Sequence, residues 1–127
     1  MPSLQTPAKP FLPAIVLATL NAKYIHASLG LRCLLANMDR HGGAGLRART
    51  QLREFVIQQR PTQIVEDLLA LNPQVIGLGI YIWNVVETTQ VVRLLKTLRP
   101  DIKIVLGGPE VSYETGEQEI CRLADHV

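Results

Sequence analysis

The chain has 127 residues, of which 47% are hydrophobic and 5% aromatic, and its formal charge at pH 7 is +2. This length and composition suit a single domain with a largely aliphatic core. The basic residues are scattered, and no run of them is interleaved with aromatics, which argues against a nucleic-acid-binding surface. No apolar run approaches the roughly 18 residues of a membrane helix, so we expect no membrane partner.

The first twelve residues are rich in proline and lack the apolar segment of a signal peptide. We expect them to form a disordered lead-in to a domain over residues 13–127. Cys33 and Cys121 have no CxxC partner and no histidine at metal-site spacing. Both fall in expected helices with apolar neighbours, which predicts buried, reduced thiols and a cytoplasmic location.

Four stretches are predicted to be strands. Three are apolar almost throughout, as strands of a parallel sheet covered on both faces are, whereas the second alternates like an edge strand. In chain order they are AIVLATL (14–20), QLREFVI (51–57), QVIGLGIYI (74–82) and IKIVLG (102–107).

Apolar residues at helical spacing fill the intervals between these strands. The helices are expected over residues 26–38, 61–71, 85–98 and 115–124. Asn84 and Glu87 have the spacing of a capping box at the start of the third helix. His126 and Val127 resemble the start of a fifth strand.

This alternation predicts an α/β fold, a doubly wound parallel sheet of about five strands with helices on both faces. The strand number favours the flavodoxin-like order 2-1-3-4-5. In such sheets a ligand lies outside the carboxyl ends of the strands where the order reverses, here between strands one and three. The loops at residues 19–24, 81–84 and 107–110 meet there.

Glycines are frequent around this point. Gly107 and Gly108 end the fourth strand, Gly79 lies in the third, and Gly30 lies early in the first helix. Missing side chains let another molecule approach the backbone closely, although tight turns and close helix packing are alternative reasons for glycine. Together these positions favour a ligand slot. Neutral, broad side chains would line a large flat ligand there: Asn21, Tyr24, Tyr81, Trp83 and Asn84. Trp83 can equally be a core or interface anchor.

Several chemistries lack their motifs. Neither GxGxxG nor GxxxxGK[ST] occurs, which argues against a nucleotide phosphate loop. A phospho-acceptor domain needs acids after strands one and three, where this chain has Asn21, Tyr81 and Trp83. No catalytic triad can be argued from spacing, and no two histidines are at metal-site spacing. We therefore predict no catalytic residue and no metal ligand.

Three segments resemble the cobalamin-binding domain found at the N-terminus of many cobalamin-type radical SAM proteins. They are YIHASLGLRCLLANM (24–38), VIGLGIYIWN (75–84) and IVLGGPEVSYE (104–114). The resemblance runs from about Leu12 to the end of the chain. It implies that the nucleotide tail of the cofactor inserts between sheet and helices, with the corrin across the carboxyl ends of the strands.

By this resemblance Gly107 and Gly108 give the tail room, Gly79 is the small residue of strand three, and His26 to Gly30 match the start of the first helix. The predicted cofactor-binding residues are Asn21, Tyr24, His26, Ser28, Gly30, Gly79, Tyr81, Trp83, Asn84, Gly107, Gly108, Pro109 and Glu110.

The chain departs from related domains in two ways. The DxHxxG motif, whose histidine ligates cobalt, is absent, because Gly30 follows His26 with the wrong spacing by one residue. His26 is therefore expected to cap the helix or contact the cofactor rather than bind cobalt. The radical SAM cluster motif CxxxCxxC is also absent. We expect a non-catalytic fragment of a radical SAM enzyme, for example a methyltransferase, whose remaining domain binds S-adenosylmethionine and a 4Fe-4S cluster.

Two other functions fit the same fold. One is an interaction or structural module that has lost its cofactor, which predicts that Tyr81 and Trp83 pack inward and leave no open slot. The other is a domain for another flat cofactor, such as flavin, or for a nucleotide, against which the missing phosphate loop counts.

Overall fold

The structure is a computed structural model that describes residues 14–22 and 28–127. The expected lead-in, Tyr24 and His26 lie outside the described residues. Four parallel strands form one sheet in the order β3-β2-β4-β5. This confirms the predicted order of the first four strands and the edge position of the second. The strands are β2 (Ile15–Asn21), β3 (Thr50–Val56), β4 (Val75–Gly79) and β5 (Lys103–Gly107).

The fifth strand is reduced to a single parallel bridge between Val105 and His126. The Leu106 N–H donates to the His126 carbonyl at 2.9 Å, and the His126 N–H donates to the Ile104 carbonyl at 3.1 Å. The described residues therefore form a sheet of four strands rather than the expected five. The bridge lies beside β5, where the predicted order places strand five.

Helices and short 3-10 turns connect the strands. The helices are α1 (Leu29–Ala36), α2 (Met38–Gly42), α3 (Pro61–Ala70), α4 (Val85–Leu98) and α5 (Glu119–Leu123). The 3-10 turns are η1 (Arg47–Arg49), η2 (Pro109–Val111) and η3 (Thr115–Glu117). In the described residues no helix is long and apolar enough to cross a membrane.

Three predicted boundaries differ for local reasons. The first helix breaks at Asn37, whose side-chain amide bonds the Cys33 carbonyl at 2.8 Å and competes with helical bonding. The fourth predicted helix is divided by the extended Gln118, whose amide donates to the Glu110 and Tyr113 carbonyls. The third predicted strand, 74–82, ends already at Gly79, because the chain turns after that residue.

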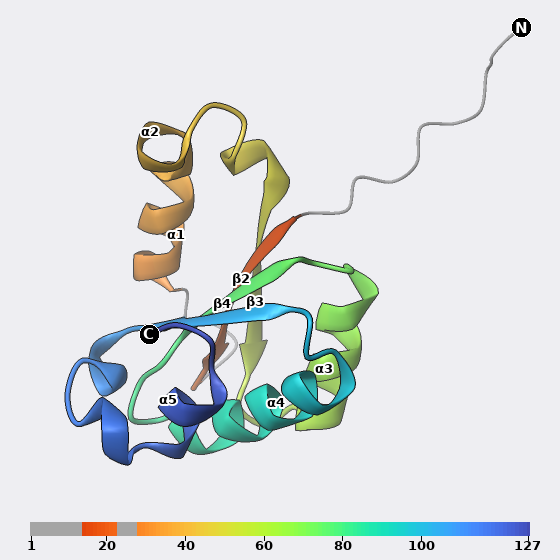
Figure 1. Ribbon diagram of the computed structural model, residues 1–127, viewed down its shortest axis with the longest axis vertical. Coiled ribbons are helices and arrows are strands. Elements are labelled where there is room, and N and C mark those ends of the chain that lie inside the picture. The colour runs from red at the N-terminus through yellow and green to blue at the C-terminus, as the bar shows by residue number, and fades with distance from the viewer. Residues whose placement is uncertain (1–13, 23–27) are drawn as a thin grey trace, which may run out of the picture.

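The main core lies on one face of the sheet. Alternate strand residues such as Ala18, Leu78 and Ile104 point to this face and are buried against α3, α4 and α5. Figure 1 shows these three helices together on one side of the sheet, with α1 and α2 on the other side. Helices therefore cover both faces, as predicted, but in the described part of the chain the second face carries only α1 and α2.

The two thiols differ from the prediction in part. Cys121 is half-buried, and burial raises the pKa of its thiol. Cys33 is exposed, so its predicted burial is wrong. The reason is that Leu31 is the single buried residue of α1, whose remaining surface faces solvent or the slot described below. Both cysteines are free.

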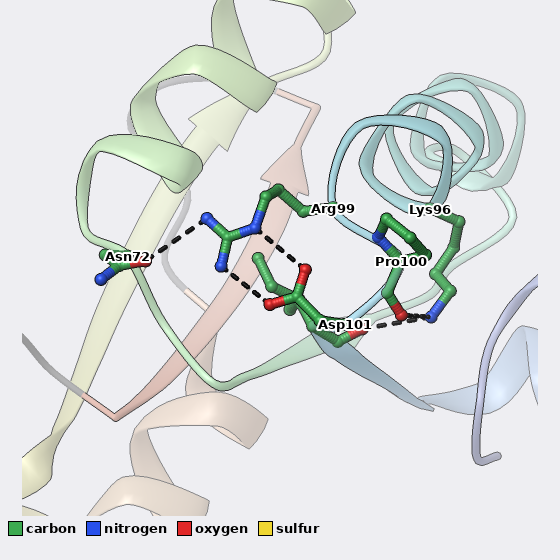
Figure 2. A network of polar contacts seen from close by, with 6 residues as sticks. Asn72, Lys96, Arg99, Pro100 and Asp101 are labelled. Carbon is green, nitrogen blue, oxygen red and sulfur yellow. Dashed lines mark hydrogen bonds and ion pairs between the residues drawn. The ribbon is translucent and has the colours of Figure 1, made fainter.

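A polar network joins the end of α4 to the amino-terminal ends of the neighbouring strands. Arg99 bonds the carboxylate of Asp101 and reaches Asn72 in the turn after α3. Figure 2 shows this arrangement and the adjacent Lys96, whose ammonium donates to the Pro100 carbonyl at 3.0 Å. These contacts fix the end of the sheet opposite to the predicted ligand site.

Lys96 also holds the C-terminal segment. Its ammonium lies 2.8 Å from a carboxylate oxygen of Asp125, and the Ile104 N–H donates to the same oxygen. The pKa of Asp125 is lowered, chiefly by the hydrogen bond from Lys96. The lowered pKa means that Asp125 contributes stability above its unfolded pKa, and this contribution is lost as the pH falls through the folded pKa.

We expect Asp125→Asn to lower the free energy of unfolding by about 1 kcal/mol at pH 7. The difference from wild type should begin to shrink below about pH 4, where the carboxyl is protonated in the unfolded state, and should vanish once the folded carboxyl is protonated at still lower pH. Urea melts at several pH values measure it. Glu119→Gln is the control, since the Glu119–Arg93 pair is half-exposed and should matter little. A pH-independent loss in Asp125→Asn would contradict this account.

Candidate cofactor-binding site

A cavity of about 540 Å³ lies between α1 and the sheet face turned away from the main core. We call it the slot. The sheet forms its floor, through the paired residues Leu17, Gly77 and Val105 and, one row further along the strands, Gly79 and Gly107. Its wall is the apolar face of α1 and α2, made by Leu31, Leu34 and Met38. The volume falls within the range typical of small-molecule sites.

The strand register explains why the floor is low. Gly79 pairs with Thr19 on one side and with Gly107 on the other, so two of the three residues in this row have no side chain. A Cβ at Gly107 would meet nothing within 4 Å, and one at Gly79 would make only ordinary contacts. These two glycines therefore leave space above the sheet. Gly77 is tighter, with a Cβ position 2.9 Å from Leu17 Cδ2.

Gly108 has a different reason to be glycine. Its φ of +107° is strained for any other residue, and a Cβ there would lie 2.4 Å from the Ile80 carbonyl oxygen. For Gly108 the tight-turn explanation holds, although the residue also lines the slot. Pro109 and Glu110 follow in η2 and lie outside the slot lining.

Tyr81 lines the slot, and Trp83 stacks on its ring. Their rings are stacked, with centroids 4.5 Å apart and planes 8° from parallel. The Tyr81 ring lies beside Gly79, and its hydroxyl is 3.7 Å from the Cβ position of Gly30. Trp83 is 49% exposed. Trp83 is thus not a core anchor, and the slot beside Tyr81 is open.

Asn84 is fully buried, and its side chain holds the turn that carries Tyr81 and Trp83. Its Oδ1 accepts from the Tyr81 N–H at 2.9 Å, while Nδ2 donates to the Leu20 carbonyl at 3.0 Å and the Gly79 carbonyl at 3.1 Å. Because its side chain is used in this way, it makes no cap bond, and the predicted capping box with Glu87 is wrong. Asn84 ties the aromatic turn to the ends of β2 and β4.

Glu54 organises the start of α1, a role that sequence reasoning missed. Its carboxylate accepts from the Ser28 N–H, from Arg32 and, at 3.4 Å, from Asn21 Nδ2. Ser28 is the N-cap of α1, and its Oγ accepts from the Leu31 N–H at 3.3 Å. Ser28 and Asn21 are both buried, so they position the wall of the slot.

Of the eleven predicted site residues that the structure describes, five line the slot, and the other six, Asn21, Ser28, Trp83, Asn84, Pro109 and Glu110, are not part of its lining. Gly30, Gly79, Tyr81, Gly107 and Gly108 line the slot. Sequence reasoning missed its aliphatic lining, such as Leu17, Leu34, Met38 and Val105, although period-two alternation places Leu17 and Val105 on the same face as the glycines. Within residues 14–22 and 28–127, no cluster of three His, Cys, Asp or Glu could hold a metal ion.

The structure is a doubly wound domain with a largely apolar cavity at the switch point of its strand order. Residues 15–127 match the B12 binding domain family, and the chain belongs to that family. The predicted flavodoxin-like fold is confirmed by a solved structure, that of a novel cobalamin-binding protein from Desulfitobacterium hafniense DCB-2.

That structure matches with a TM-score of 0.59 and 23% sequence identity, over 91% of this chain and 52% of the other. The chain therefore spans about half the length of this structural relative. At this identity the likeness concerns the fold. No curated protein sequence matches the chain.

Proposed function

We propose that this domain is the cobalamin-binding module of a larger radical SAM enzyme, with the nucleotide tail in the slot and the corrin across the carboxyl ends of the strands. The observation that carries the proposal is the slot itself. It is apolar, its floor is lowered by Gly79 and Gly107, and it opens at the switch point beside Tyr81.

The residues present fit such a ligand. A flat tail base would lie on the glycine floor and be covered by Leu31, Leu34 and Met38. Tyr81 and Trp83 would contact the edge or face of the corrin. When bound, the cofactor supplies the cobalt chemistry, such as carrying a methyl group, and the protein binds and orients it.

The radical SAM context rests on the resemblance of residues 75–84 and 104–114 to that family's domains. S-adenosylmethionine and the 4Fe-4S cluster would be bound by a further domain of the enzyme. The family's common lack of DxHxxG agrees with a cobalt that has no histidine ligand from this chain. Two free thiols agree with a cytoplasmic location.

The interaction-module alternative predicts a closed site with its aromatics turned inward. The open slot and the half-exposed Trp83 favour cofactor binding instead. A largely apolar slot of this size, lined in part by Tyr81, is typical of small-molecule binding sites.

The tail's place in the slot can be tested with the single tryptophan of the chain. Hydroxocobalamin should quench Trp83 emission saturably, because the corrin would lie beside its ring. Cobinamide carries the corrin but no nucleotide, and should bind at least about tenfold more weakly for want of the buried base. Free N-acetyltryptophanamide corrects for light absorbed by the corrinoid. Equal affinities for the two corrinoids would contradict a tail in the slot.

A further inference from the structure

We propose that the slot selects corrinoids whose tail carries an apolar base of the benzimidazole type over those whose tail carries a purine. This inference rests on the proposed function and specifies its ligand. The two classes share the corrin and differ in the base. A dimethylbenzimidazole presents methyl groups at its outer edge, whereas adenine presents an amino group and ring nitrogens that bond to water.

Among the described residues, the side chains lining the slot offer those nitrogens almost no hydrogen-bonding partner. The floor residues Leu17 and Val105 and the wall residues Leu31, Leu34 and Met38 carry no nitrogen or oxygen. In the described part of the chain, the Tyr81 hydroxyl is the single polar side-chain group of the lining. It lies 3.7 Å from the Cβ position of Gly30, and the Tyr81 ring lies beside Gly79.

The backbone under the slot is already paired. The Gly79 carbonyl accepts from Thr19 Oγ1 at 3.2 Å and from Asn84 Nδ2 at 3.1 Å. The Gly107 carbonyl accepts from the Ile80 N–H at 2.8 Å. Below these residues the strands β2, β4 and β5 pair in continuous register. The carbonyls of the two floor glycines are therefore already occupied as acceptors.

A purine in the slot would consequently lose bonds to water with few replacements, and such losses are costly in an apolar site. A benzimidazole loses little and gains apolar burial. Shape does not separate the two bases, because both are flat and bicyclic. The discrimination we infer is therefore chemical, and it should amount to about tenfold or more in Kd.

The test compares cobalamin with the adenine-containing cobamide, both as dicyano forms so that neither base is bound to cobalt. Equilibrium dialysis against the purified chain, read by corrin absorbance, gives both Kd values. We expect cobalamin to bind more tightly by about tenfold or more. Equal binding, or tighter binding of the adenine cobamide, would overturn the inference while leaving the proposed function intact. Failure of both to bind would overturn both.

A variant locates the source of the preference. Val105→Thr adds one hydroxyl to the floor at nearly constant volume and should reduce the preference at least about threefold. Val56→Thr makes the same exchange at a half-buried strand residue outside the slot and should leave it unchanged. Thermal melts establish that both variants fold. A preference that Val105→Thr leaves intact would mean that the slot lining is not its origin, and would overturn the inference.

Discussion

Gly108→Ala is expected to destabilise the domain severely. The residue has a φ of +107° and a ψ of 170°, a region that is occupied almost only by glycine. A methyl group there would also lie 2.4 Å from the Ile80 carbonyl oxygen and 2.9 Å from the Ile80 nitrogen. Both are backbone atoms of a buried residue, so they cannot move aside as a flexible side chain would.

We expect a loss of about 3 kcal/mol or more in the free energy of unfolding, and a fall in Tm of about 10 °C. Circular dichroism melts measure both. Gly116→Ala is the matched control, because a Cβ there would meet nothing within 4 Å and its φ is not positive. A Gly108→Ala protein as stable as wild type would show that the turn after β5 is not under this constraint.

Gly107→Leu, one residue earlier, is expected to have the opposite profile. Gly107 is exposed at the end of β5, its φ is not positive, and its Cβ would stand in open space over the slot. A leucine there should leave the Tm within a few degrees of wild type. Its side chain would stand above the floor of the slot, where we propose that the cofactor tail lies.

Cobalamin affinity should therefore fall by at least about a hundredfold, since overlap with a rigid ligand removes its buried contacts rather than weakening them. Titration by Trp83 quenching gives the Kd, and a melt confirms the fold. Gly107→Ala is the graded control and should cost less. Unchanged affinity in the leucine variant would mean that the tail does not pass this residue.

Most of the fold could be predicted because most strands and helices can be recognised from the apolar pattern of their own residues. The run 102–107 is apolar and β-prone, and β5 forms there, starting one residue later than predicted and ending at the predicted residue. The end of β4 was not predictable in the same way. It depends on the hydrogen bonds that the Asn84 side chain donates to the Leu20 and Gly79 carbonyls. Leu20 lies 64 residues before Asn84 in the chain.

The glycine turn shows what sequence reasoning can and cannot resolve at the site. The sequence marks Gly107 and Gly108 together, and both do lie at the slot. Their separate roles depend on backbone angles and on the nearness of Ile80, neither of which is written in the local sequence. Sequence reasoning missed Glu54 for a similar reason. Its partners at the start of α1 are brought to it only by the pairing of β3 with β2.

The most direct test of the account is whether the folded chain retains a corrinoid. The purified protein would be mixed with excess hydroxocobalamin, passed through a desalting column, and its visible spectrum recorded beside a thermal melt. The account predicts corrin absorbance in the protein fraction, approaching one corrinoid per chain. A colourless protein that still melts cooperatively would contradict the assignment of the slot to cobalamin.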